Sequence, residues 1–142
     1  MNVQKSLLLV CTLVVVLSGK SLADESTDKK IKGVRKAIDV CIELLEKRDF
    51  EGFVARAVHP SKAKDIKKTD ASLKRCIDGL KRDRDALLAA LKASRTIEPV
   101  FRKSVNPKEE DAFLVLEKPI FEDRELRYFI FSDRDGIWYF LA

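Results

Sequence analysis

Two kinds of periodicity follow one another along this chain, and their order constrains the fold more than any other feature. Between residues 30 and 93 the apolar residues recur every three or four positions, which is the spacing of one helix face. From residue 96 onward β-branched and aromatic residues stand between turn signals, which is typical of strands. Helices first and strands afterwards predict an α+β domain, in which N-terminal helices pack against a curved antiparallel β-meander.

The helical half begins with the clearest stripe. It predicts a first helix over residues 30–47, with these apolar positions on one face: Ile31, Val34, Ile38, Ile42 and Leu45. Asp49 is placed to cap a short second helix, residues 50–58, before Pro60 ends it.

The rest of the helical half is less regular. Residues 61–69 are rich in lysine and lack a period, which predicts an exposed connection. A further helical pattern covers residues 70–93, but Gly79 weakens it and Arg84 falls where the apolar stripe should continue. We therefore expect a break or kink near residues 81–83 and two shorter helices.

Four strands are expected in the second half, at residues 96–104, 111–118, 124–132 and 137–141. Pro99 suggests that the first of them is an edge strand or contains a bulge. The third strand carries apolar residues on both faces, which predicts either a central place in a curved sheet with a filled concavity or a self-association surface. On the second alternative we expect a homodimer.

The first residues indicate export. Lys5 is followed by an apolar run, residues 7–17, that is too short to span a bilayer, and Ser21-Leu22-Ala23 is a small-x-small cleavage site. Residues 1–23 are therefore predicted to be a signal peptide, and residues 24–142 a single α+β domain with no membrane span after cleavage. We expect a periplasmic or secreted protein.

The charge of the mature chain argues against nucleic acid as a partner. The whole chain carries a net charge of +5, and two of its lysines lie in the predicted signal. Basic and acidic residues alternate almost everywhere, whereas a polyanion-binding face needs one sign of charge.

Two cysteines, Cys41 and Cys76, remain once the signal with Cys11 is removed. In an oxidising compartment such a pair predicts a disulfide, which would stabilise the domain by roughly 4 kcal/mol in the chain-entropy estimate. The alternative is that both are small buried apolar residues on helix faces.

Three segments together resemble exported members of the NTF2-like, cystatin-like superfamily: Glu46-Lys47-Arg48-Asp49-Phe50-Glu51-Gly52-Phe53, Leu87-Leu88-Ala89-Ala90-Leu91-Lys92 and Asp135-Gly136-Ile137-Trp138-Tyr139-Phe140. The resemblance implies a conical sheet wrapped around the helices. Members of that superfamily include isomerases and hydratases, ligand carriers and interaction modules, so the resemblance implies a fold more than an activity.

No catalytic site, metal site or cofactor is predicted. The only histidine, His59, stands in a predicted loop beside Pro60 and has no second histidine to join it. Asp133 and Asp135 are assigned to a hairpin turn rather than to a calcium loop. The acidic clusters at residues 109–111 and 122–125 flank predicted turns, where solvated charge is the ordinary explanation.

The aromatic residues of the last two strands are either core or the wall of a ligand pocket. As a pocket, they predict ligand contacts from Tyr128, Trp138 and Arg127. The expected function is an exported, non-enzymatic binding or interaction module for a small apolar ligand or a protein partner. The alternatives are an isomerase or hydratase of the NTF2-like type, and a partner-capping protein similar to a protease inhibitor.

Overall fold

The computed structural model of the protein describes residues 22–141. The predicted signal peptide falls on residues 1–23, so all but its last two residues lie outside the described part. The chain divides after Lys30 into two compact units, and the first is described only from Leu22 to Lys30, where it is helical. No helix within residues 22–141 combines the length and the hydropathy that a bilayer crossing needs.

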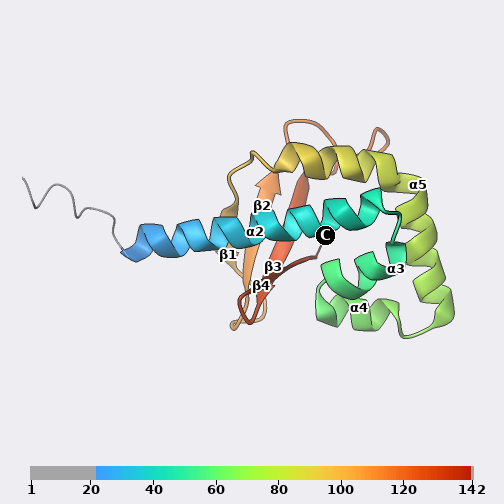
Figure 1. The fold of residues 1–142 in the computed structure, drawn as a ribbon, viewed down its shortest axis with the longest axis horizontal. Coiled ribbons are helices and arrows are strands. Elements are labelled where there is room, and N and C mark those ends of the chain that lie inside the picture. The colour runs from blue at the N-terminus through green and yellow to red at the C-terminus, as the bar shows by residue number, and fades with distance from the viewer. Residues whose placement is uncertain (1–21, 142) are drawn as a thin grey trace, which may run out of the picture. The chain divides into compact units, whose positions relative to one another are not determined.

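The predicted α+β class is confirmed: helices fill the first half of the described chain and strands the second (Figure 1). The helices are α2 (Leu22–Glu46), α3 (Phe50–Gly52), the π-helix η1 (Phe53–Ala57), α4 (Pro60–Ile66) and α5 (Asp70–Ser94). The strands are β1 (Val100–Lys103), β2 (Glu110–Val115), β3 (Tyr128–Arg134) and β4 (Ile137–Phe140).

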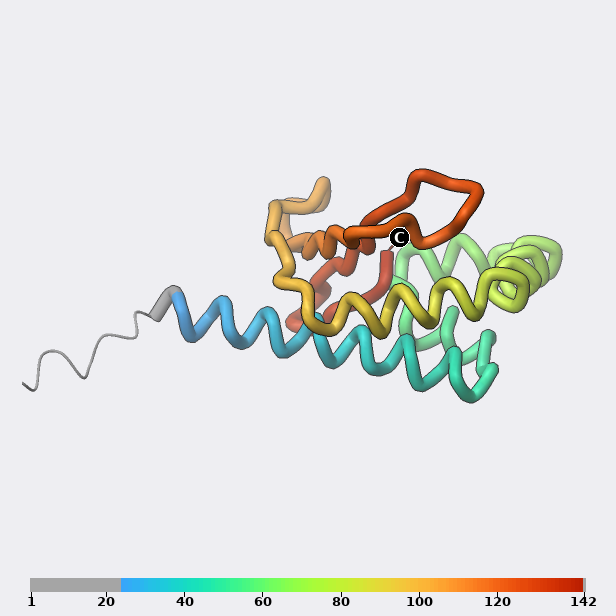
Figure 2. The backbone as a smooth tube through the Cα atoms, turned by 90° about the horizontal axis from the view of Figure 1, so that it is seen from above, coloured from blue at the N-terminus to red at the C-terminus, as the bar shows by residue number. Residues whose placement is uncertain are grey.

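The four strands form an antiparallel meander in the order β1-β2-β3-β4. Within the second unit, α2 and α5 lie along one face of this sheet, as Figures 1 and 2 both show. We call that face the inner face and the opposite one the outer face. β1 begins directly after Pro99 and is an edge strand, in agreement with the sequence prediction.

The stripe of α2 supplies one side of the core. Val34, Ile38, Ile42 and Leu45 are all buried, as their spacing predicts. The sheet supplies the other side through alternate residues of its strands, because successive side chains point to opposite faces. Those buried on the inner face are Ala112, Leu114, Phe129, Phe131 and Trp138.

The expectation of two shorter helices over residues 70–93 is wrong, because α5 is one continuous helix. It does change direction partway, between its light green and yellow parts in Figure 1. The arginine that interrupts its apolar stripe binds the end of α2. Arg84 Nε donates to the carbonyl of Leu45 at 2.8 Å, and Nη2 donates to that of Glu46 at 3.4 Å. Carbonyls at a helix C-terminus lack intrahelical partners, and a cation is favourable there.

The lysine-rich segment 61–69 is largely exposed, as expected, but it is not an irregular connection, since most of it forms α4. Its start follows ordinary helix rules: Pro60 occupies the first turn, and the side chain of His59 accepts a hydrogen bond from the N–H of Ser61 at 3.4 Å. Only Ala63 of this helix is buried, so no apolar period marks it in the sequence.

β3 and β4 join through the predicted hairpin turn. Arg134 pairs with Ile137, so the loop has two residues, Asp135 (φ 55°) and Gly136 (φ 82°), as a type I′ turn requires. β3 is apolar on both faces, since Phe129 and Phe131 are buried on the inner face, while Tyr128 and Ile130 lie on the outer face. The homodimer that this pattern suggests stays a prediction.

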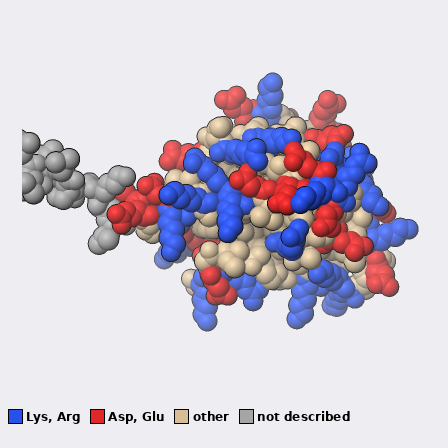
Figure 3. Space-filling view, viewed as in Figure 1, with Lys and Arg blue, Asp and Glu red and all other residues tan. Residues whose placement is uncertain are grey.

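The charged residues are mixed, as the sequence indicates. Figure 3 shows Lys and Arg side chains interleaved with Asp and Glu over the visible face, rather than a single-signed basic patch.

The backbone of α2 approaches the sheet closely at Gly33. A Cβ atom there would lie 2.6 Å from Cδ1 of Trp138, closer than real Cβ atoms come, and the buried indole ring has little room to move. A Cβ atom added at Gly79, in α5, would have no neighbour within 4 Å. One glycine is therefore required by packing, whereas the other is not.

We expect Gly33→Ala and Gly79→Ala to have opposite effects on the free energy of unfolding. Overpacking at residue 33 costs about 1–3 kcal/mol, which exceeds the gain of up to about 1 kcal/mol from better helix propensity. Gly79→Ala gains propensity alone and should stabilise by about 0.5–1 kcal/mol. Urea denaturation followed by circular dichroism measures both, and equal effects of the two substitutions would contradict this packing.

Candidate functional site

Trp138 lines a small cavity in the second unit. The residue is 7% exposed, and its ring packs against that of Phe101 with 5.6 Å between the ring centroids. The cavity measures about 210 Å3 and its wall is mainly apolar. Its lining residues come from α2, from η1 and from the β3–β4 hairpin: Gly33, Lys36, Ala37, Val40, Arg56, Ala57, Gly136, Ile137 and Trp138.

The other two residues predicted for a ligand site lie elsewhere. Tyr128 is on the outer face of the sheet and is 41% exposed, whereas Trp138 is on the inner face. Arg127 precedes β3 and donates to the carbonyl of Glu117 and to the carboxylate of Glu125, both at 3.3 Å. The structure does not bring the three side chains together.

Lys36 and Arg56 are the two basic residues among those that line the Trp138 cavity, and no lining residue is acidic. Arg56 Nη2 lies 3.9 Å from Oδ2 of Asp49, which is a long ion pair between exposed groups. Lys36 has no ion-pair partner among residues 22–141. Sequence reasoning missed both residues, because the cavity joins segments that are far apart in the chain.

The π-helix η1 places Arg56 and Ala57 at this cavity. Its i→i+5 pattern is evident in the hydrogen bond from the N–H of Val58 to the carbonyl of Phe53, at 3.1 Å. π-helical turns are rare and frequently occur at functional sites. The π-helix could not be predicted from the sequence, because residues 50–58 have the pattern of an ordinary helix.

A wider groove of about 620 Å3 lies between α5 and residues 115–120. Alanines form its helical wall: Ala86, Ala89, Ala90 and Ala93. No aromatic residue lines it, and its two charges, Glu117 and Lys118, are adjacent in the chain and opposite in sign. This groove therefore has the size of a ligand site but lacks the convergent polar groups that give such sites specificity.

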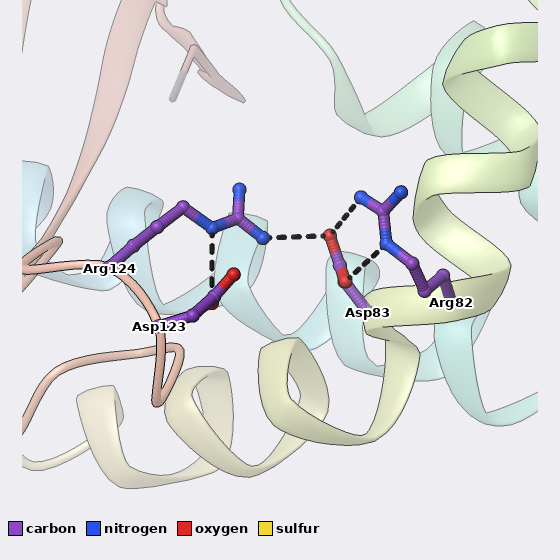
Figure 4. Close-up of polar contacts among 4 residues, drawn as sticks. All are labelled: Arg82, Asp83, Asp123 and Arg124. Atoms are coloured by element: carbon purple, nitrogen blue, oxygen red, sulfur yellow. Dashed lines mark hydrogen bonds and ion pairs between the residues drawn. The ribbon is translucent and has the colours of Figure 1, made fainter.

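A third hollow, of about 250 Å3, lies beneath the connection between β2 and β3 and includes Cys76 in its lining. Four charges hold this connection on α5 (Figure 4). Asp83 accepts two hydrogen bonds from Arg82 at 2.9 Å and one from Arg124 at 3.2 Å, while Arg124 also reaches Asp123 at 3.4 Å. The two guanidinium groups lower the pKa of Asp83, Arg82 contributing most.

The sequence predicts that His59 lies in a loop. In the structure the residue is buried and forms the N-cap of α4. Its Nδ1 lies 2.8 Å from Oγ of Ser61, and its Nε2 lies 3.5 Å from Oε2 of Glu109. A hydroxyl, an imidazole and a carboxylate in series are the parts of a hydrolytic triad. The three cavities described above are lined by other residues, however, and His59 serves as the N-cap of α4.

The acidic cluster at residues 109–111 is also less solvated than expected. The side chain of Glu109 is only 14% exposed and faces His59. Asp111 accepts a hydrogen bond from the hydroxyl of Ser132 at 2.6 Å, across the β2–β3 pair. Within residues 22–141 no group of three or more His, Cys, Asp and Glu side chains is arranged to hold a metal ion.

Asp133 is the acidic residue whose environment most disfavours its charge. Burial raises the pKa of its carboxyl group, and the nearby charges of Glu110, Asp135 and Glu109 act in the same direction. A backbone hydrogen bond involving Gly136 opposes the shift. Its Oδ1 is buried and has no hydrogen-bond partner in the described chain.

Of the two alternatives for the cysteines, the structure shows free thiols rather than a disulfide. Cys41 lies in the core on α2, and burial raises its pKa to about 12. Cys76, on α5, is half-buried, and its pKa is also raised by burial. Neither is an activated thiolate.

No protein-family model, no curated protein and no solved structure matches this chain. Its function must therefore be inferred from the geometry of the described residues.

We expect the two thiols to react at very different rates with iodoacetamide at pH 8. At a pKa of about 12 only about one Cys41 side chain in ten thousand is ionised, and it is shielded as well. Peptide mass mapping should find Cys76 labelled first and Cys41 labelled only after unfolding. Failure of both thiols to react in the unfolded, unreduced protein would instead reveal a disulfide.

We expect Asp133→Asn to stabilise the protein at pH 7. The pKa of Asp133 is higher in the folded than in the unfolded state. The stability that Asp133 contributes is therefore fully present below its unfolded pKa and is lost as pH rises through its folded pKa. The difference in free energy of unfolding between variant and wild type should therefore vanish below the ordinary Asp pKa of 3.8. Asp78→Asn, at an exposed position of α5, is the matched control and should change little at either pH.

Proposed function

We propose that this protein is an exported, non-enzymatic binding module that holds a small apolar ligand against Trp138. The observation that carries the proposal is the cavity of about 210 Å3, which combines an aromatic wall with a few charged groups. That combination is the usual composition of a small-molecule site.

The cavity volume limits the ligand. A protein cavity of about 150 Å3 accommodates benzene. At about 210 Å3, the Trp138 cavity suits a molecule of about eight to ten non-hydrogen atoms, such as one aromatic ring with a short substituent.

The side chains around the cavity favour binding over catalysis. Of its nine lining residues only Lys36 and Arg56 ionise, and none offers a carboxylate, an imidazole, a hydroxyl or a thiol. General acid–base catalysis needs a group that gives or takes a proton near neutral pH. His59 and Glu109, which could do so, are not among the residues that line this cavity.

The same proposal places the domain in the NTF2-like, cystatin-like superfamily. Membership is supported by the order of helices before a meander and by the hairpin that presents Trp138 after Asp135-Gly136. Export is supported by the signal pattern of residues 1–23.

The proposal is tested by native mass spectrometry of protein purified from an oxidising compartment, compared with its denatured mass, and by a titration with benzyl alcohol. Trp138 is the only tryptophan, so its fluorescence reports on this cavity. We expect a saturable change with a dissociation constant of about 1 mM or below, given the few atoms available for contact.

Two variants make the titration specific. Ala37→Leu fills the Trp138 cavity and should abolish the fluorescence change, whereas Ala89→Leu fills part of the groove on α5 and should leave it intact. Circular dichroism checks that both variants fold. No co-purified ligand together with no saturable change in the wild type would refute the proposed function.

A further inference from the structure

We infer that the ligand of the Trp138 cavity is a small organic acid, with its apolar body against the indole ring and its carboxylate between Lys36 and Arg56. The inference rests on the proposed function and names the chemical class of the ligand. It is carried by the charges around the cavity rather than by its volume.

The two cations reach one cavity from two separate elements. Lys36 belongs to α2 and Arg56 to η1, so the fold rather than local sequence brings them together. Like charges beside one cavity repel each other. Asp49, 3.9 Å from Arg56, offsets part of this repulsion, but no residue that lines the cavity is acidic. An anion bound between them removes that cost.

Two other basic residues of the helical half hold close ion pairs, whereas Lys36 has no ion-pair partner among residues 22–141 and Arg56 has only a long one. Lys47 pairs with Glu43 at 2.6 Å, and Lys92 pairs with Glu46 at 2.7 Å. The ion pair of Arg56 with Asp49 spans 3.9 Å, which leaves most of the planar guanidinium fork available to a carboxylate.

The apolar wall selects among anions. Phosphate or sulfate would place charge on every side, so part of it would face Trp138, Val40 and Ile137 and lose hydration without compensation. A monocarboxylate with an aromatic or aliphatic body has one charged end and one apolar end. That distribution matches a cavity with cations at its border and an indole ring in its wall.

The test compares benzoate with benzamide and benzylamine, which have nearly the same shape and differ in charge. Titrations follow Trp138 fluorescence at low ionic strength. We expect benzoate to bind about tenfold more tightly than benzamide, benzylamine to bind most weakly, and added salt to weaken benzoate alone.

Variants assign the preference to the two cations. The double variant Lys36→Gln/Arg56→Gln should lower benzoate affinity about tenfold and leave benzamide unchanged. Lys32→Gln/Arg35→Gln is the matched control, because it removes the same charge from exposed positions of α2 that do not line the cavity. It should retain the preference for benzoate.

The outcomes separate the two proposals. Equal affinity for benzoate and benzamide, with saturation for both, would overturn the organic-acid inference while the binding function stands. A preference that survives in Lys36→Gln/Arg56→Gln would also overturn it. The absence of any saturable response to all three compounds would instead count against the proposed function itself.

Discussion

The contact between α2 and Trp138 is the constraint on which the inner face of this domain depends. Gly33 lets the helix backbone lie against the indole ring, at a distance that any side chain would prevent. Phe101 supports the ring from the edge strand β1. The same contact leaves a hollow beside it, where Ala37 and Ala57 are too small to fill the space between helix and sheet. Gly33 and Trp138 therefore belong both to the packing of the inner face and to the lining of the candidate site.

Much of the fold could be predicted because burial leaves a period in the sequence. The stripe from Val34 to Leu45 is buried along its length, so the first helix is visible from spacing alone. α4 lacks such a period, since only Ala63 is buried, and its signal was the pair His59-Pro60 at a helix start. In the sequence Arg84 appeared as an interruption of the apolar stripe of the next helix. Its partners are two backbone carbonyls of α2, and because every residue has such a carbonyl, the sequence pattern does not reveal this contact.

The candidate site was harder to predict, although part of it follows from turn geometry. A two-residue turn at Asp135-Gly136 makes Arg134 face Ile137, and counting back from that pair places Asp133 beside Trp138. Tyr128 then falls on the opposite face from Trp138. Lys36 and Arg56 could not be found in this way, because their proximity to Trp138 depends on how α2 and the π-helix pack in three dimensions.

The network around Asp83 has a consequence for how the domain responds to its surroundings. At its ends the connection between β2 and β3 is held by backbone hydrogen bonds, such as Leu116 to Arg127 at 2.6 Å and Ile120 to Leu126 at 2.8 Å. Its attachment to α5 through Arg124 is ionic, with the arginine side chain 48% exposed and so open to counterions. Dissolved salt competes with the ionic contact of Arg124 and hardly with the backbone hydrogen bonds. The buried side chain of Ile120 anchors the same connection in the core, so a rise in salinity would loosen the Arg124 contact and leave the apolar anchor and the backbone hydrogen bonds in place.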